Sequence, residues 1–132
     1  MNKFPDTEEE RIAKIIVDFA YHIHVNVGPG LLESAYQAML AHDLRKRGLK
    51  VVEQYPVPLR YDGIVLDDVS YRADIMVNDL VMVELKSVEE MHPVFFKQLL
   101  TYLRLTDTHL GLLINFGMYR FKDGMKRILN GY

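Results

Sequence analysis

Apolar residues recur at helical spacing in two segments near the start of the chain. The first stripe comprises Ile12, Ile15, Ile16, Phe19 and Ile23. Thr7 and Glu10 form a capping-box pattern ahead of it, so we expect a helix over residues 7–26. After the break at Gly28-Pro29-Gly30, a second helix is expected over residues 31–47, ending at Gly48. Its buried side is expected to consist of Leu32, Tyr36, Met39 and Leu40.

The middle of the chain is strand-like. Apolar runs predict strands at 50–53, 57–61, 69–77 and Val81–Lys86. Pro56 and Pro58 indicate an edge strand or an irregular connection between the first two. Asp62-Gly63 predicts a hairpin turn, and the last two strands are expected to join near Asn78 and Asp79.

The last third of the chain predicts one helix and two strands. The helix is expected to begin at Pro93 and to run to about Leu105. Leu110–Asn115 is a near-continuous apolar run, which predicts a buried strand, and residues 119–129 predict a short strand or a hairpin turning at Asp123-Gly124. This order of elements predicts an α/β sandwich with a mixed β-sheet flanked by helices. We expect one domain over residues 1–132, with disorder confined, if present, to residues 1–6.

Composition narrows the class of protein. The chain has 132 residues, of which 49% are hydrophobic and 26% charged, values typical of a globular domain. It has no cysteine, which excludes disulfides and Cys-ligated metal sites. No apolar stretch approaches the roughly 20 residues of a membrane span, so a cytoplasmic protein is expected. The net charge of −2 argues against a protein that coats nucleic acid non-specifically.

Three ionisable side chains are expected to lie together on one face of the sheet. Glu84 and Lys86 are two positions apart on a predicted strand, so their side chains share a face. A three-residue connection at 78–80 pairs residue 77 with 81, 75 with 83 and 74 with 84. This register gathers the neighbouring aliphatic side chains on the opposite face, whereas a two-residue turn would oppose Asp74 to Val83 and split the apolar set. The hydrophobic pattern therefore selects the register that joins the two carboxylates.

Two opposed carboxylates need a cation. At ~4 Å and an effective dielectric near 20, they repel by about 4 kcal/mol. A hard divalent ion reverses that sign, and oxygen ligands favour Mg²⁺ or Mn²⁺ over zinc. Such a metal can bind a phosphodiester oxygen and lower the pKa of a bound water, while Lys86 can polarise the attacking water. The spacing alone leaves open a second interpretation, in which these are solvated surface charges.

Several blocks of the chain resemble one protein family. Gly30-Leu31-Leu32-Glu33-Ser34-Ala35-Tyr36 matches the G-x-x-E-x-x-Y signature of the GxxExxY protein family. Similar blocks follow in the same order, beginning at Tyr71, Val83, Gln98 and Gly111, so the resemblance covers about Ile12 to Leu129. That family is placed in the PD-(D/E)XK nuclease superfamily. The resemblance therefore implies a restriction-endonuclease-like sandwich.

The resemblance also assigns roles to residues. Asp74 matches the motif aspartate, Glu84 the (D/E) position and Lys86 the lysine, while Ala73 stands where the name-giving proline would be. Glu33 matches the early helix acid that supplements the metal site in many members, which makes Glu33, Asp74 and Glu84 the expected metal ligands.

Two further residues, Gln98 and Tyr102, resemble the Q-x-x-x-Y element of exonuclease-like branches. From the residues alone, Glu33 could equally be a first-turn acid that favours the helix dipole. Gln98 and Tyr102 lie one helical turn apart, so they could contact a nucleotide or a metal-bound water, or instead form a hydrogen bond at the helix edge.

The leading hypothesis is a Mg²⁺- or Mn²⁺-dependent nuclease that acts on DNA or RNA, with nucleic acid as substrate and no membrane association. One alternative is a non-catalytic module with a nuclease fold that binds nucleic acid or a protein partner. A weaker alternative is a structural dimer or assembly factor. A domain of 132 residues has little room for separate recognition elements, so a homodimer or a protein partner is a further expectation.

Overall fold

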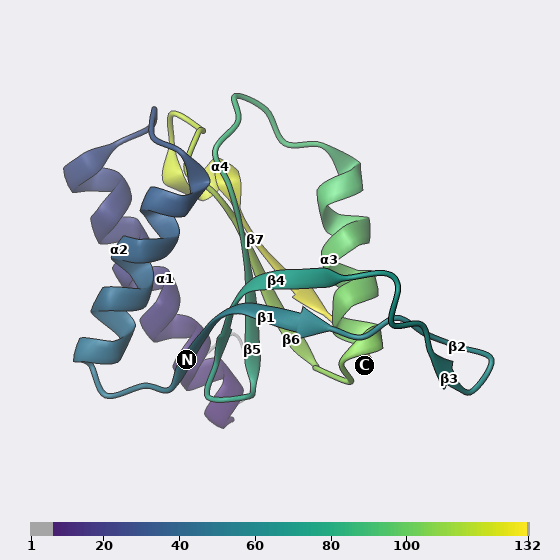
Figure 1. Ribbon diagram of the computed structural model, residues 1–132. Helices are drawn as coiled ribbons and strands as arrows, with labels where there is room; N and C mark the ends of the chain where they lie inside the picture. Colours follow the sequence, from purple (N-terminus) through teal and green to yellow (C-terminus); the bar gives the residue numbers. More distant parts are fainter. Residues whose placement is uncertain (1–6, 132) are drawn as a thin grey trace.

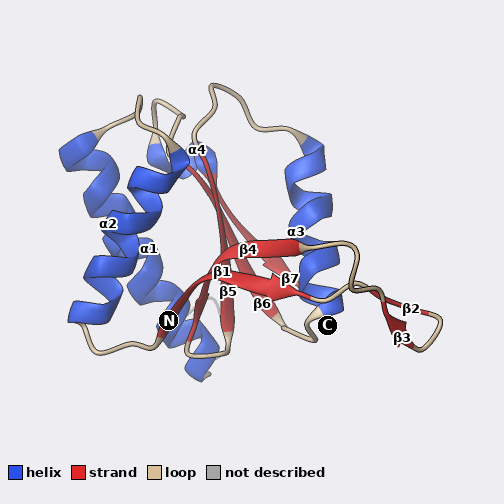
Figure 2. Ribbon diagram, viewed as in Figure 1, coloured by secondary structure: helices blue, strands red, loops and turns tan. Residues whose placement is uncertain are grey.

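The computed structural model describes residues 7–131 and has three layers (Figure 1). Helices α1 (Glu8–Val27) and α2 (Glu33–Lys46) cover one face of a five-stranded sheet, and α3 (Pro93–Leu105) covers the other (Figure 2). The sheet consists of β1 (Val51–Val57), β4 (Tyr71–Val77), β5 (Val81–Lys86), β6 (Leu110–Asn115) and β7 (Met125–Leu129). The predicted sandwich is confirmed, whereas the expectation about residues 1–6 lies outside the described residues. Within residues 7–131, no helix is both long and apolar enough to cross a bilayer.

The ends of the two N-terminal helices follow from local sequence signals. Thr7 caps α1, since its hydroxyl oxygen accepts a hydrogen bond from the Glu10 amide at 3.2 Å. Beyond the end of α2, Gly48 adopts a φ of 94°, and its amide donates to the Arg45 carbonyl at 2.9 Å. Only glycine reaches this left-handed conformation without steric cost, which explains why the helix ends here.

The loop ahead of α2 differs from the prediction. The helix begins at Glu33 rather than at residue 31, and Leu32 is 78% exposed instead of buried. Tyr36 explains this difference, because its hydroxyl donates to the Gly28 carbonyl at 2.6 Å and accepts from the Leu31 amide at 3.2 Å. These bonds keep the segment before Glu33 non-helical and leave Leu32 facing outwards.

The sheet has the order β1-β4-β5-β6-β7. Only β5 and β6 run parallel, because α3 carries the chain back across the sheet between them. Cross-strand pairing of Val77 with Val81 and of Ile75 with Val83 confirms the predicted register. The predicted bounds of β5, α3 and β6 are confirmed as well.

The first strand region is longer than predicted. A single strand, β1, runs through Pro56, and only β2 (Arg60–Tyr61) forms from the expected second strand. β1 is an edge strand, and an edge strand tolerates a proline, which has no amide hydrogen to donate. β2 pairs with β3 (Ile64–Val65) around the predicted Asp62-Gly63 turn, and this hairpin projects away from the sheet (Figure 1).

Each face of the sheet has its own apolar cluster. Toward α1 and α2 lie the side chains of Ile75, Val77, Val81, Val83 and Leu85. Toward α3 lie those of Ala73, Met76, Met82 and Leu113. The aliphatic residues of β5 therefore share one face, as the hydrophobic pattern predicted, and Glu84 and Lys86 lie on the other face, toward α3.

The C-terminal region corrects one expectation. Of the two predicted alternatives, the short strand is confirmed as β7, whereas the turn at Asp123-Gly124 is replaced by a short helix α4 (Phe121–Gly124) that leads directly into it. Gly124 allows this arrangement, because a Cβ at this position would lie 2.3 Å from the Asn115 carbonyl oxygen. The glycine is therefore a site of close backbone approach rather than a turn residue.

Gly117 packs tightly against the segment that follows β5. An added Cβ would lie 2.2 Å from the Val88 carbonyl oxygen and 2.6 Å from its amide nitrogen, and neither backbone atom can rotate away. We expect Gly117→Ala to lower the free energy of unfolding by about 3 kcal/mol. Urea unfolding followed by circular dichroism measures this change, with exposed Ser34→Ala as a control expected to stay within about 0.5 kcal/mol. A loss below about 1 kcal/mol for Gly117→Ala would contradict the packing.

Candidate active site

β4 and β5 separate at the two candidate acids. Their backbone pairing ends at Ile75–Val83, so the expected backbone pair of residues 74 and 84 is wrong. The carboxylates take the place of the missing ladder bonds. The Asp74 amide donates to Glu84 Oε1 at 2.9 Å, and the Leu85 amide donates to Asp74 Oδ2 at 2.7 Å. Each acid is thus clamped by the backbone of the opposite strand, and the two are held together.

Each carboxylate keeps one oxygen outside this clamp. Within the described residues, no donor is bonded to Glu84 Oε2. Asp74 Oδ1 has a long contact, 3.4 Å from Gln54 Nε2. Carboxylate oxygens with free lone pairs are the ligands that hard divalent cations prefer. The donor set therefore fits Mg²⁺ or Mn²⁺.

Burial raises the pKa of both acids, and repulsion from the charge of Asp74 adds to the shift of Glu84. Glu84 is 5% exposed, and its burial, together with the charge of Asp74, raises its pKa from 4.5 to about 8. Burial likewise raises the pKa of Asp74. The Lys86 ammonium opposes both shifts without cancelling them. A cation stronger than one lysine would therefore be needed to keep both carboxylates ionised at neutral pH.

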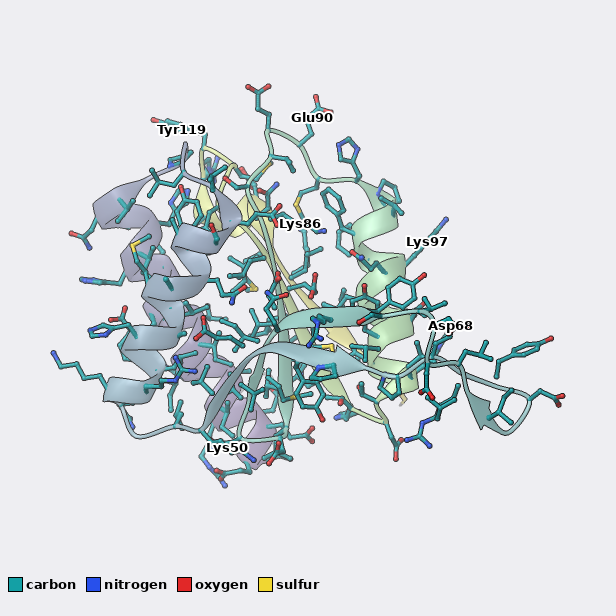
Figure 3. The ribbon with its side chains drawn as sticks, in the orientation of Figure 1. Lys50, Asp68, Lys86, Glu90, Lys97 and Tyr119 are labelled. Carbon is teal, nitrogen blue, oxygen red and sulfur yellow. The ribbon has the colours of Figure 1, made fainter. Side chains whose placement is uncertain are left out.

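Lys86 lies between the sheet and α3 (Figure 3). Its Nζ donates to Gln98 Oε1 at 3.3 Å and lies 4.8 Å from the centroid of the Phe95 ring. Gln98 Nε2 in turn donates to the Tyr102 hydroxyl at 3.2 Å. Burial raises the pKa of Tyr102, and the charge of Glu84 adds to that shift. The structure therefore brings Gln98 and Tyr102 together with the lysine.

The fold and this cluster agree with a comparison of the sequence with known families. A family model described as the PD-(D/E)XK nuclease superfamily matches residues 10–128. The chain belongs to the PD-(D/E)XK nuclease superfamily. No curated protein and no solved structure matches it significantly. The match is to the superfamily, so the finer assignment to the GxxExxY family stays a prediction.

In this PD-(D/E)XK domain, Glu33 lies apart from the other two acids. It is the exposed first residue of α2, and its charge contributes to the raised pKa of Glu84. Over residues 7–131, no three His, Cys, Asp or Glu side chains are grouped closely enough to hold a metal ion. Asp74 and Glu84 therefore form the centre of the candidate metal site, and Glu33 lies within electrostatic reach of it.

Three residues near the PD-(D/E)XK cluster were not singled out by sequence reasoning. Phe95 contacts Lys86, and Gln54 contacts Asp74 and, at 2.8 Å, Gln37 of α2. The types of Phe95 and Gln54 are common on helix and strand surfaces, so no local signal marks these two residues. A search for polar residues one turn beyond Glu33 would have found Gln37, because helical neighbours four apart share a face.

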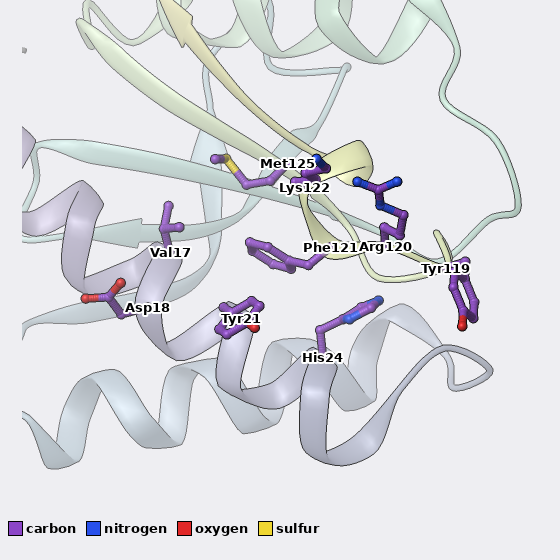
Figure 4. Close-up of a pocket in the computed structure, with 9 residues that line it drawn as sticks. All are labelled: Val17, Asp18, Tyr21, His24, Tyr119, Arg120, Phe121, Lys122 and Met125. Carbon is purple, nitrogen blue, oxygen red and sulfur yellow. The ribbon is translucent and has the colours of Figure 1, made fainter. Parts of the chain in front are cut away.

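An open groove lies elsewhere on the PD-(D/E)XK domain, between α1 and the segment around α4 (Figure 4). Its lining includes Tyr21, His24, Tyr119, Arg120 and Phe121. None of the predicted site residues lines this groove. The candidate chemistry therefore belongs to the cluster of Asp74, Glu84 and Lys86 and not to the groove.

Proposed function

We propose that this protein is a metal-dependent nuclease that hydrolyses phosphodiester bonds of DNA or RNA. The observation that carries the proposal is the clamped pair of Asp74 and Glu84, each with one oxygen outside the backbone clamp, on the sheet face that also bears Lys86. Membership of the PD-(D/E)XK nuclease superfamily supports it. Nucleases of this superfamily generally use divalent metals, which agrees with the oxygen donor set.

The proposal extends to the GxxExxY family. Its support is the match of residues 30–36 to the family signature. In the fold, Tyr36 of this block stabilises the loop before α2 by donating a hydrogen bond to the Gly28 carbonyl. Glu33 of the same block lies within electrostatic reach of Glu84. In this proposal Glu33 assists the metal ligands from α2, either directly or through bound water.

Each side chain of the cluster has a separate role in the proposed hydrolysis. Asp74 and Glu84 would hold Mg²⁺ or Mn²⁺, and that ion supplies Lewis-acid stabilisation of the phosphodiester together with a more acidic bound water. Lys86 orients the attacking water and neutralises charge that develops on the phosphoryl oxygens. Gln98 holds the ammonium of Lys86 in place, and Tyr102 holds Gln98. Clamping by backbone amides lets both carboxylates keep their position during turnover.

A substrate panel tests the proposal. Purified protein is incubated with single- and double-stranded DNA and RNA, with Mn²⁺, with Mg²⁺ or with EDTA, beside Lys86→Ala. We expect cleavage of at least one substrate that requires the metal and is lost in the variant. A protein that binds Mn²⁺ and cleaves none of the substrates would favour the non-catalytic alternative.

Substitution of Gln98 is expected to lower the cleavage rate less than substitution of Lys86, without changing metal affinity. Gln98→Met keeps the length of the side chain but removes the amide oxygen that accepts from Lys86 at 3.3 Å. We expect about a tenfold lower rate at saturating Mn²⁺, because the ammonium loses its orientation. Mn²⁺ affinity should be unchanged, since Gln98 contacts neither carboxylate. Steady-state kinetics over a range of Mn²⁺ concentrations measures both quantities, and a change confined to metal affinity would contradict the assigned role.

A further inference from the structure

A line of polar contacts connects helix α2 with Asp74. Arg45 Nη1 donates to Glu53 at 2.8 Å, and Gln37 Nε2 donates to the same carboxylate at 3.1 Å. The Gln37 Oε1 atom accepts from Gln54 Nε2 at 2.8 Å, and that nitrogen also lies 3.4 Å from Asp74 Oδ1. We call the two amides, Gln37 and Gln54, the glutamine relay.

The carboxylates at the two ends fix the direction of the relay. Glu53 accepts hydrogen bonds from Arg45 and Gln37, and these bonds lower its pKa, so it is ionised and accepts only. Gln37 must therefore turn its NH₂ group to Glu53 and its oxygen to Gln54. As a result, Gln54 presents an NH₂ group, whose two hydrogens can serve Gln37 and Asp74. The relay is thus complementary to an ionised Asp74.

Gln54 has a backbone conformation that is unfavourable for its residue type. Its φ is 52°, in the left-handed region, which costs about 1–2 kcal/mol for a residue with a Cβ. Pairs form on either side of it, at Glu53–Ile75 and Tyr55–Ala73, and the ladder is interrupted between them. The interruption lies directly beside Asp74. A glycine would take this conformation at no steric cost, but it could not contact the carboxylate.

We propose that Gln54, oriented by Gln37, is a positioning residue that holds Asp74 Oδ1 toward the candidate metal site. This inference rests on the proposed function. The other oxygen of Asp74 is clamped by the Leu85 amide, so Oδ1 is the atom left to a cation. A contact of 3.4 Å restrains the rotation of the carboxylate and still leaves lone pairs on Oδ1 free. Loss of the relay should therefore weaken metal binding more than it slows the metal-loaded enzyme.

Gln54→Gly tests this role, because it removes the side chain and relieves the backbone at the same time. We expect Mn²⁺ affinity to fall about tenfold, the loss of one hydrogen bond to a charged group. The rate at saturating Mn²⁺ should stay within about threefold, and the melting temperature should be unchanged or higher. Asp62→Gly is the matched control: Asp62 has a φ of 53° and lies in the β2–β3 hairpin. It should match Gln54→Gly in stability and leave Mn²⁺ affinity unaltered.

A metal-free measurement separates failure of the relay from failure of the proposed function. In two-dimensional NMR spectra, the side-chain NH₂ signals of Gln54 should shift in Asp74→Asn and again in Gln37→Met. Those shifts would support the relay even if the wild-type protein bound no Mn²⁺ and cleaved nothing. Unchanged Gln54 signals in both variants would overturn it, as would a Gln54→Gly protein that melts lower while its Mn²⁺ affinity is intact.

Discussion

Lys86→Ala is expected to lower the rate of Mn²⁺-dependent cleavage by about 10²- to 10³-fold. The ammonium is the cation that the protein itself supplies on the face of Asp74 and Glu84, and removing one group that stabilises developing charge has effects of this size. Mn²⁺ affinity should be equal or tighter, because a positive charge near the carboxylates is gone. Single-turnover cleavage at saturating Mn²⁺, together with a Mn²⁺ titration, measures both effects.

Lys97→Ala is the matched control for this variant. Lys97 lies on the same helix as Gln98 but points away from the sheet into solvent (Figure 3). Its loss should change the rate by less than about threefold, because an exposed charge that contacts none of the site residues contributes little. Equal losses in the two variants would show a general electrostatic effect on nucleic-acid binding instead of a role for Lys86 at the reacting phosphate.

The metal-free protein is expected to lose stability as the pH rises from about 5 to 8. The pKa of Glu84 is about 8 in the folded protein and 4.5 when unperturbed. Between these values the unfolded chain has released the proton and the folded protein still holds it, so raising the pH favours unfolding. The gap between the two pKa values corresponds to a loss of about 5 kcal/mol in the free energy of unfolding. This loss is complete above about pH 8 and absent below about pH 4.

Glu84→Gln should remove most of this slope. The amide stays neutral at all pH values, and its oxygen can still accept from the Asp74 amide. We therefore expect Glu84→Gln to be more stable than the wild-type protein at pH 8 in EDTA and to bind Mn²⁺ far more weakly. Urea unfolding at several pH values measures the difference, with Glu89→Gln at an exposed position as a control. Parallel pH profiles for wild type and Glu84→Gln would contradict the buried, proton-holding state of Glu84.

Burial explains which parts of the fold were predictable. Val81, Val83 and Leu85 recur at every second position of β5, and only one pairing with Ile75 and Val77 puts all five on one face. A slip by one residue would split this set between the two faces, so the register followed from the hydrophobic pattern.

Other parts depended on contacts that no local pattern encodes. The sequence places Leu32 in a helical stripe, yet the Tyr36 hydroxyl holds the preceding loop non-helical. Phe121–Gly124 forms a helix because Gly124 packs against the distant Asn115 carbonyl. Both outcomes are tertiary contacts that override local preference.

The candidate site was predictable in its members and not in its geometry. Period-two alternation put Asp74 on the face of Glu84, but it implied a continuous ladder where the strands in fact part. The parting of β4 and β5 goes with carboxylate-to-backbone bonds that alternation does not encode. The β1–β4 ladder is interrupted separately at a left-handed Gln54, a conformation that glutamine rarely adopts and does not signal.

The most direct test of the central claim, that Asp74 and Glu84 hold one divalent ion between them, is a Mn²⁺ titration followed by electron paramagnetic resonance at neutral pH. The wild-type protein should bind Mn²⁺, and both Asp74→Asn and Glu84→Gln should bind it at least about 100-fold more weakly, beyond the 10–100-fold cost of losing a partner that only supports a ligand. Equal Mn²⁺ binding by the wild-type protein and both variants, or none by the wild type, would contradict it.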